Sequence, residues 1–390
     1  MVALGECCEI VSGATPKSSV PDFWGGDVAW ATPADLSELS GAYIETTPRK
    51  LTAAGLASCS AKVLPVGSVL LSSRAPIGHV AINRAPMATN QGFKSLIPEA
   101  EVLDAKYLYH WLCSKKAYLQ SLGNGATFKE ISKTTVARVE IPVPSIEEQR
   151  RIATVLDQAD VVRARRRQSI GQLDDLPRAI FLEMFGGMTE RLRFVAEVGS
   201  QEKGSIRTGP FGSQLLHSEF VDEGVAVLGI DNVVTNRFRW HGRRYVTPEK
   251  YQKLKRYTVV PGDVLITIMG TCGRCVVVPE DIPTAINTKH ICAITVDRAQ
   301  VLPEFLRGCF LWHPVSRRFL LQRAKGSIMD GLNMGIIKEM PMPVPPLGLQ
   351  AEFVRRAHVS ARAFEVATRS EREIEELFSA IQSHAFAGQL

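Results

Sequence analysis

The sequence predicts a mixed α/β chain in which one arrangement occurs twice, a globular block followed by a long helix. The repeat is visible in two stretches, since Ile141-Pro-Val-Pro-Ser-Ile-Glu-Glu-Gln149 and Met342-Pro-Val-Pro-Pro-Leu-Gly-Leu-Gln350 each open a long charged helical run. Each run follows a block of short β-type segments and turn residues. We therefore expect two related globular domains separated by two long helices that form an antiparallel coiled coil, with an internal pseudo-two-fold repeat.

The composition is that of a globular protein with two or three domains. The chain has 390 residues, of which 45% are hydrophobic and 22% charged. No apolar run reaches the ~18–20 residues of a membrane helix, and the start lacks the pattern of a signal peptide. We expect a cytoplasmic protein with no membrane partner. The net charge of +6 permits a polyanionic partner.

The eight cysteines are scattered, which favours reduced, mostly buried thiols over a disulfide framework. Cys272 and Cys275 form one C-x-x-C, and His290 and Cys292 could complete a zinc site. Because there is no second C-x-x-C, buried thiols without a metal are the favoured interpretation.

The first block, residues 1–142, contains a β-type run at 63–72 and a helical pattern at 104–122. Pro142 and Pro144 then predict an extended connector, because proline cannot donate to a central strand. Ser145 is the expected N-cap of the first long helix, with Glu148 at the capping-box position.

The first long helix is expected from about Ile146 to about Phe185, within a segment assigned to residues 143–187. Near 40 residues give a length of about 60 Å. Its apolar positions follow 3-4 spacing, with Arg163 and Arg166 where seam positions are expected. Pro177 should kink or interrupt this helix.

The second long helix, within residues 343–390, keeps strict 3-4 steps from Phe353 to Ala385 over about five heptads. Two helices with one apolar stripe each most simply pack on each other, and an antiparallel pair places the two blocks at opposite ends. The expected contacts of the pair are Ile152, Leu156, Ile170, Leu173, Ile180, Phe353, Phe364, Ile374, Phe378 and Ile381.

The second block, residues 188–342, follows the order of the first. Residues 260–266 match 64–70 in type, and residues 285–290 are paired with 88–93. The pairing aligns Asn287 with Asn90. A helical stretch at 303–322 matches that at 104–122.

No catalytic constellation stands out. The sequence has no phosphate loop, no G-x-G-x-x-G opening a helix, no H-E-x-x-H and no nuclease or amino-methyltransferase motif. A Ser/His/Asp triad remains open, but no residue is marked as a nucleophile.

Basic and amide-rich loops are the candidates for function, because Arg and Lys suit guanine edges, Asn and Gln suit adenine edges, and both hold phosphates. The alternative for Asn90 and Asn287 is that they cap turns. The basic, aromatic-interleaved stretch at 237–244 is the stronger nucleic-acid candidate. The candidates in the first block are Lys17, Ser72, Arg74, Asn90, Gln91 and Lys94, and those in the second are Arg237, Arg239, Arg243, Arg244, Arg274, Asn287, Lys289 and His290.

The arginines at 163–167 lie in the middle of the first long helix. A solvated face or ion pairs with the second helix are favoured over a phosphate contact, and Glu365 and Glu371 could pair with Arg163 and Arg166.

The tandem Ile-Pro-Val-Pro and Met-Pro-Val-Pro openings, each with a glutamine five residues on, resemble those of the specificity subunits of type I restriction–modification systems. Leu4-Gly-Glu6, Gly13-Ala-Thr-Pro16, residues 67–74 and Asn90-Gln-Gly-Phe93 are similar to landmarks of that family's recognition domains. The resemblance covers essentially the whole chain. The second opening departs from it, because Gly348-Leu-Gln350 lacks the Glu-Glu-Gln of the first.

The resemblance implies a chain that reads double-stranded DNA without cutting or methylating it and binds no cofactor itself. It would dock two modification subunits and two restriction subunits, which use S-adenosylmethionine, ATP and Mg. Each domain would read one half of an asymmetric bipartite site, with half-sites about one DNA turn apart. The alternatives are a scaffold whose coiled coil joins two modules that do not bind DNA, and a hydrolase with a cryptic site.

Overall fold

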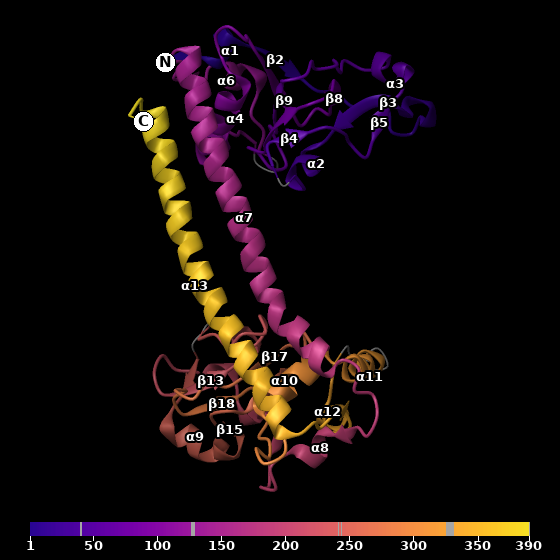
Figure 1. Ribbon diagram of the computed structural model, residues 1–390, viewed down its shortest axis with the longest axis vertical. Helices are drawn as coiled ribbons and strands as arrows, with labels where there is room; N and C mark the ends of the chain where they lie inside the picture. Colours follow the sequence, from indigo (N-terminus) through magenta and orange to yellow (C-terminus); the bar gives the residue numbers. More distant parts are fainter. Residues whose placement is uncertain (40, 126–128, 241, 243, 325–330, 390) are drawn as a thin grey trace. The chain divides into compact units, whose positions relative to one another are not determined.

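The computed structural model describes residues 1–390 except 40, 126–128, 241, 243, 325–330 and 390, and it divides into two units. The first unit contains Met1–Arg167 and Arg369–Leu390, and the second contains Gln168–Thr368. Each long helix contributes to both units: α7 (Ile146–Phe185) begins in the first, and α13 (Leu347–Phe386) begins in the second (Figure 1). The predicted mixed α/β class with two long helices is confirmed.

The first unit contains two larger sheets. One has the strand order β2-β9-β6-β7-β4 and the other the order β5-β3-β8, in which β3 and β8 are parallel. The elements are β1 (Val2–Ala3), α1 (Leu4–Cys7), β2 (Cys8–Ser12), η1 (Pro21–Phe23), β3 (Trp24–Ala31), α2 (Pro33–Ser37), β4 (Tyr43–Ile44), β5 (Lys50–Leu51), α3 (Ala53–Ala57), β6 (Val69–Leu71), β7 (Val80–Asn83), β8 (Met87–Thr89), β9 (Lys94–Pro98), α4 (Ala105–Ser114), α5 (Lys116–Ser121), α6 (Lys133–Ala137) and β10 (Glu140–Ile141).

The second unit repeats the core of this topology, with four strands in each of its larger sheets instead of five and three. Its larger sheets have the orders β12-β19-β16-β17 and β14-β13-β18-β15, and β13 and β18 form the parallel pair. The elements are β11 (Arg193–Phe194), α8 (Val195–Val198), β12 (Ile206–Thr208), η2 (Gly212–Gln214), η3 (His217–Glu219), β13 (Val225–Leu228), η4 (Ile230–Asn232), β14 (Tyr245–Val246), α9 (Pro248–Leu254), η5 (Lys255–Tyr257), β15 (Thr258–Val259), β16 (Val264–Thr267), β17 (Cys275–Val277), β18 (Ala285–Asn287), β19 (Ile291–Ile294), α10 (Pro303–Trp312), α11 (Pro314–Ala324), α12 (Met334–Lys338) and β20 (Pro341–Met342).

The two predicted helical stretches after the sheets are each broken into two helices, which corrects the prediction of single helices. In the first unit α4 ends at Ser114 and α5 begins at Lys116. In the second, Pro314 ends the run of α10 and begins α11, because proline cannot continue the hydrogen bonding of the preceding helix.

The long helices pack antiparallel within each unit. In the first unit Ile152 and Leu156, near the start of α7, share a core with Phe378 and Ala385, near the end of α13. In the second unit the end of α7 shares a core with Phe353, near the start of α13. The antiparallel prediction is therefore confirmed in both units.

The predicted 3-4 seam is also confirmed. Every predicted position of α13 from Phe353 to Ala385 is buried or half-buried. Of the predicted contact residues, Ile152, Leu156, Ile180, Phe353 and Phe378 are buried, and Ile170, Leu173, Phe364, Ile374 and Ile381 are half-buried.

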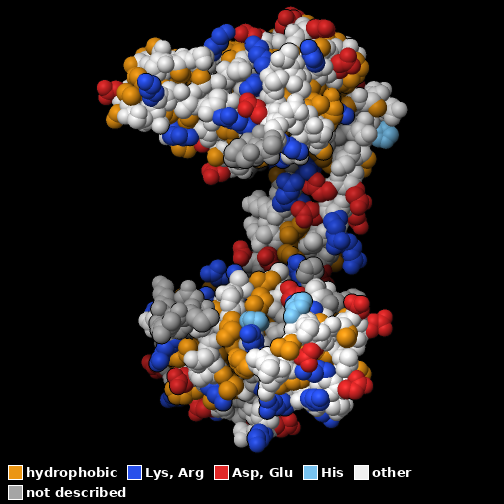
Figure 2. All heavy atoms as spheres, turned by 180° about the vertical axis from the view of Figure 1, so that it is seen from behind, with side chains coloured by type: hydrophobic (Ala, Val, Ile, Leu, Met, Phe, Trp, Pro, Cys, Tyr) orange, Lys and Arg blue, Asp and Glu red, His pale blue; other side chains and the backbone are white. Residues whose placement is uncertain are grey.

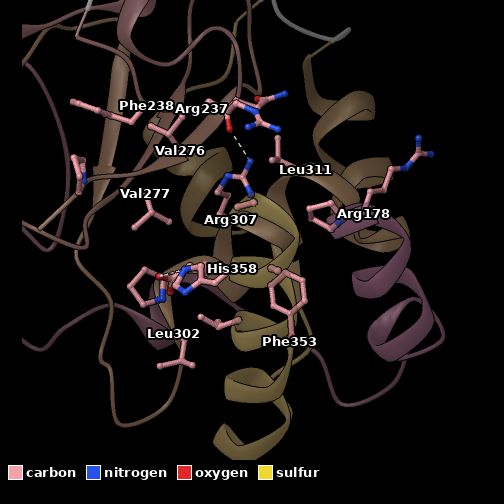
Figure 3. A pocket seen from close by; sticks show the side chains of 18 of the residues that line it. Arg178, Arg237, Phe238, Val276, Val277, Leu302, Arg307, Leu311, Phe353 and His358 are labelled. Carbon is pink, nitrogen blue, oxygen red and sulfur yellow. Dashed lines mark hydrogen bonds and ion pairs between the residues drawn. The ribbon is translucent and has the colours of Figure 1, made fainter. Parts of the chain in front are cut away.

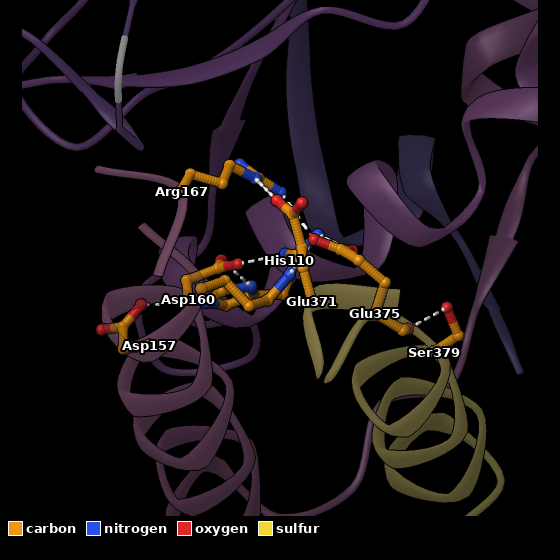
Figure 4. Close-up of polar contacts among 8 residues, drawn as sticks. His110, Asp157, Asp160, Arg167, Glu371, Glu375 and Ser379 are labelled. Carbon is orange, nitrogen blue, oxygen red and sulfur yellow. Dashed lines mark hydrogen bonds and ion pairs between the residues drawn. The ribbon is translucent and has the colours of Figure 1, made fainter. Parts of the chain in front are cut away.

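Two arginines of α7, Arg163 in the seam and Arg167 beside it, pair with carboxylates of α13 in the first unit. Figure 4 shows Arg167 with Glu371 and Glu375. Arg163 binds Glu375 through two guanidinium nitrogens and lies 3.9 Å above the ring of Phe378. Arg167 binds Glu375 at 2.8 Å and Glu371 at 3.8 Å. Hydrogen bonding by Arg163 holds the pKa of Glu375 below its usual value. Interhelical ion pairing is confirmed, but Arg163 uses Glu375 rather than the predicted Glu371 or Glu365.

A second polar contact in the first unit ties α4 to α7. The buried His110 of α4 lies 2.8 Å from Asp157 of α7 (Figure 4). Lys106 pairs with the same carboxylate. The helix pair and the globular part of this unit therefore share polar as well as apolar contacts.

Gln149 and Gln350, the residues that align the two repeats, make the same three hydrogen bonds in their units. The side-chain amide of Gln149 donates to the carbonyls of Val102 and Pro144, at 2.9 Å each, and its Oε1 accepts from the Asp104 amide. Gln350 donates likewise to Gln300 and Pro345 and accepts from Leu302. Each buried glutamine thus joins the proline connector to the start of α4 or α10.

Pro177 lies inside α7 without ending it, so of the two predicted outcomes, a kink or an interruption, the interruption does not occur. A proline has no N–H, which leaves the carbonyl four residues earlier without its helical donor. That carbonyl belongs to Leu173, and the hydroxyl of Ser360 on α13 donates to it at 3.2 Å. Ser360 is a buried seam residue, so the neighbouring helix replaces the missing bond.

We expect Ser360→Ala to cost about 1 kcal/mol of stability in the natural background, because a buried carbonyl loses its donor. In a Pro177→Ala background the same change should cost close to zero, because the new N–H of residue 177 donates to Leu173. Urea unfolding of the four proteins forms the double-mutant cycle. An equal cost of Ser360→Ala in both backgrounds would contradict this explanation.

No helix among the described residues is both long enough and apolar enough to cross a membrane.

Candidate nucleic-acid interface

The turn after the parallel strand pair has the same backbone bonding in both units. In the first unit the Asn90 amide donates to the Ala31 carbonyl at 3.0 Å, and in the second the Thr288 amide donates to the Leu228 carbonyl at 2.9 Å. The structure therefore aligns Asn90 with Thr288, one residue from the predicted alignment with Asn287. Gln91 and Lys289 then occupy the same position in the two turns.

Asn90 and Asn287 both stabilise their turns. The side-chain oxygen of Asn90 accepts from the Gly92 amide at 2.9 Å. Asn287 is fully buried, and its side-chain amide donates to the Ile291 carbonyl at 2.7 Å. The turn-capping alternative is therefore correct for Asn287, because a side chain with no exposed surface cannot reach a ligand.

The loops after the central strands are closed by a buried hydroxyl in each unit. In the first unit Ser72 donates to the Pro76 carbonyl at 2.7 Å and accepts from the His79 amide at 2.8 Å. In the second, Thr267 accepts from the Arg274 amide at 2.9 Å and donates to the Thr271 carbonyl. Ser72 is thus a loop-closing residue and not a surface contact, which corrects its prediction. The sequence signal for this role is that Ser72 and Thr267 occupy equivalent positions when the two loops are aligned.

Arg74 and Lys94 lie together in the first unit on either side of Glu130. Lys94 Nζ is 3.1 Å from one carboxylate oxygen, and Arg74 Nη1 is 3.6 Å from the other. The side chain of Lys94 is only 9% exposed, so it neutralises Glu130 rather than facing solvent. Arg74 is one-third exposed and keeps a surface that a ligand could contact.

The segment just before Lys17 contacts the turn that carries Gln91 in the first unit. Both side chains are exposed. The Ala14 amide donates to the Thr89 carbonyl at 2.9 Å, and the Thr15 hydroxyl donates to Gln91. Gly13 allows this approach, since a Cβ there would lie 2.0 Å from the Asn90 carbonyl oxygen. Gly209 has the same role against Asn287 in the second unit, and the repeated glycine is a signal that could have been read from the sequence.

Three basic residues gather in the second unit. Burial is the main cause that lowers the pKa of His290, and the positive charges of Lys289 and Arg244 lower it further. Arg244 is also paired with Asp231. Lys289 and His290 are half-buried, and Arg274 is exposed on the neighbouring loop. The structure therefore brings four of the predicted residues to adjacent loops.

The basic stretch at 237–244 divides into two parts. Arg239 and Trp240 are exposed, whereas Arg237 binds Asp174 of α7 and stacks on Phe364 of α13. Arg243 lies outside the described residues. Trp240, absent from the predicted contacts, is 40% exposed beside Arg239, and its place in a basic loop is the signal for it.

The surface charges are mixed. Figure 2 shows Lys and Arg side chains interspersed with Asp and Glu on both units. The candidate basic residues therefore lie at particular loops of each unit and do not belong to a continuous basic surface on the face shown. Among the described residues, no three His, Cys, Asp or Glu side chains are placed to hold a metal ion, and the eight cysteines form no disulfide.

Sequence comparison finds relatives over most of the chain. Residues 1–170 match the family described as "Type I restriction modification DNA specificity domain". The MjaIX specificity subunit of Methanocaldococcus jannaschii is 40% identical over 180 residues, which cover 45% of this chain and 40% of that protein. The EcoBI specificity subunit of Escherichia coli is 23% identical over 335 residues, which cover 78% and 70%. For the M. jannaschii relative, the chain thus spans about two fifths of the relative's length.

Two solved structures share the fold. A chain from a study of complex assembly and conformational transition of the type I R-M system has a TM-score of 0.66 at 18% identity and covers 100% of this chain and 97% of its own. The S subunit of a type I system from M. genitalium has a TM-score of 0.55 at 13% identity and covers 98% and 95%. The chain is thus similar in sequence to the type I specificity domain over residues 1–170, and it shares the fold of these two structures over nearly its full length.

Proposed function

We propose that the chain reads double-stranded DNA as the specificity subunit of a type I restriction–modification complex, each unit reading one half of an asymmetric bipartite site. The observation that carries the proposal is the repeated turn after β8 and β18. The backbone bonding is the same, but the turns present Gln91 in one unit and Lys289 in the other. An amide suits adenine and an ammonium suits guanine, so similar scaffolds would read different half-sites.

The neighbouring loops add groups suited to DNA. Lys17 and Arg74 belong to the first unit, and Arg239, Arg274 and Lys289 to the second; these side chains supply phosphate and base contacts. The chain itself would carry no catalytic function and bind no cofactor. S-adenosylmethionine, ATP and Mg would be used by its partners.

The partners we propose are two modification and two restriction subunits. α13 carries apolar side chains outside the seam: Val359 and Val366 in the second unit are 62% and 64% exposed, and Leu377 in the first is 60% exposed. Exposed apolar residues on a helix suit a partner helix. We assign these positions to the modification subunits.

Mapping methylated adenines in a host that expresses this chain with its modification subunit tests the proposal. We expect one asymmetric bipartite sequence to be methylated and no such sequence in a host without this chain. A gel shift on random-sequence DNA, with and without the modification subunit, addresses the alternative of a scaffold that does not bind DNA. If neither condition gives sequence-selective binding, the DNA proposal is rejected.

We further propose that the helix pair sets the gap between the half-sites. Inserting one heptad into both α7 and α13 preserves the seam and adds about 10 Å of helix. The mapped target should keep both half-sites and lengthen its gap by about 3 bp, at ~3.4 Å per base pair. A heptad inserted into α7 alone is the control and should abolish methylation by breaking the register. An unchanged gap in the double insertion would reject this role.

A further inference from the structure

The loop between η4 and β14 of the second unit is anchored at Asn236. This residue has a left-handed backbone (φ 58°), and its side-chain oxygen accepts from the Cys275 amide at 3.0 Å. Its carbonyl accepts from Nη2 of Arg307 at 2.7 Å, while Nε of Arg307 donates to the Cys275 carbonyl at 3.2 Å. One end of the loop is thereby fixed to α10 and β17 (Figure 3).

The next residue, Arg237, attaches the loop to both long helices of the same unit. Its Nη2 lies 2.5 Å from Oδ1 of Asp174 on α7. The guanidinium carbon lies 3.8 Å from the centre of the Phe364 ring on α13. The Arg237 side chain is 38% exposed and that of Asp174 is 59% exposed. These contacts direct Arg237 to the helices, beside an open pocket of about 1320 Å³ lined by α7, α13 and the globular part of the second unit.

The exposed residues of the loop follow at once. The Asn232 side-chain amide donates to the Arg239 carbonyl at 2.7 Å, and the Arg239 amide donates to the Asn232 carbonyl at 3.2 Å. Trp240 packs edge-on against Phe238, with ring centroids 5.6 Å apart. Arg239 and Trp240 are therefore held between Asn232 and Arg237, and both side chains face solvent.

We infer that Arg237 is a positioning residue: Asp174 and Phe364, on the helix pair, set how the loop presents Arg239 and Trp240 to DNA. The inference rests on the proposed function and adds helix residues to the determinants of one half-site. An exposed ion pair and a cation–π contact are each modest. Losing one should loosen the loop without unfolding the unit.

The matched test compares Asp174→Asn with Asp175→Asn. Both remove one charge from adjacent residues of α7, and the Asp175 carboxylate makes no ion pair with another described residue. The full chain, with its modification subunit, is titrated with three duplexes: the mapped target and the target with either half-site scrambled. We expect Asp174→Asn to reduce discrimination at one half-site about two- to fivefold. In Asp174→Asn, discrimination at the other half-site and the melting temperature should equal the values measured for Asp175→Asn.

Arg237→Gln separates positioning from direct contact. If Arg237 acts through Asp174, the double variant with Asp174→Asn should bind like Arg237→Gln alone. If the fold-losses in DNA binding of Arg237→Gln and Asp174→Asn multiply in the double variant, Arg237 contacts DNA itself and the inference is overturned. Identical behaviour of Asp174→Asn and Asp175→Asn would also overturn it. Equal loss at both half-sites would also overturn it. A natural chain without sequence selectivity would instead reject the proposed function, and the inference with it.

Discussion

Replacing Phe181 by alanine is expected to lower the free energy of unfolding of the second unit by about 3–5 kcal/mol. Phe181 lies on α7 and is fully buried. Its ring centroid is 5.2 Å from that of Phe185, 5.7 Å from Phe305 and 5.4 Å from Phe353. This one side chain therefore joins α7, α10 and α13, and its loss removes contacts with all three elements.

The void left by Phe181 should persist, because the facing residue of α10 is Gly308. A Cβ at Gly308 would lie 2.4 Å from Cε2 of Phe181, so the phenylalanine ring fills the space above the glycine backbone. Glycine has no side chain that could move into the cavity, and the cost of a cavity rises with the volume that neighbours cannot fill. We therefore expect a loss in the upper part of the range.

Hydrogen exchange of backbone amides measures this loss unit by unit, which a single unfolding transition of a two-unit chain would not. The amides of the second unit should lose protection by the expected amount. Leu176→Ala is the matched control, because Leu176 is on the same helix and 40% exposed. A loss below about 1 kcal/mol for Phe181→Ala would contradict the packing argument.

The features that sequence predicted well depend on local periodicity. The seam of α13 could be located to the residue because helical geometry alone puts Phe353, Ala357 and Ser360 on one stripe. The same geometry placed Arg163 and Arg166 in the α7 seam. Sequence alone could not show that α7 continues through Pro177, because the compensating donor, Ser360, is distant in sequence and close only after the helices pack.

The repeat was visible in Gln149 and Gln350, but their role was not. Each glutamine binds carbonyls at two separate places in its unit, and those places meet only in the folded chain. The residue types in the proline-rich openings therefore indicated a repeat, but they did not indicate that the glutamines hydrogen-bond the connector to the start of a helix.

Loop positions were predicted less well than helices because neighbouring side chains in a strand or turn point in different directions. The predicted alignment of the turns was wrong by one residue. It made the buried Asn287 the counterpart of Asn90, whereas the structure gives that position to Thr288. The partner of a long side chain such as Arg237 is equally hard to predict from sequence. Its residue type suits DNA or a carboxylate equally, and only the fold places Asp174 within reach.

The largest polar effect is expected at Asp263, the residue just before β16. Its side chain is fully buried and pairs with Arg207 of β12, whose side chain is 12% exposed. The carboxylate also accepts from the Val260 amide at 3.0 Å and from the Thr295 hydroxyl at 2.5 Å. We expect Asp263→Ser to cost about 3–5 kcal/mol, because it leaves a buried guanidinium without its carboxylate.

The first unit supplies a matched replacement for this pair. Arg207 faces Ala293 across β12 and β19, as Val11 faces Ser95 across β2 and β9. Asp263 precedes β16 as Ser68 precedes β6, and Ser68 is fully buried with its hydroxyl bonded to the Pro65 carbonyl. The same scaffold therefore folds with valine and serine at these two positions.

Combining Arg207→Val with Asp263→Ser should accordingly cost less than Asp263→Ser alone, because the double change removes both buried charges together. Exchange protection of the second unit in the two single variants and the double variant measures the coupling. Additive losses would contradict a dominant ion pair and assign the cost to the hydrogen bonds of Val260 and Thr295. The carboxylate holds the turn that leads into β16, and β16 ends at Thr267, where the loop bearing Arg274 begins. Local loosening in Asp263→Ser should therefore also weaken DNA binding at one half-site, and the double variant should restore it.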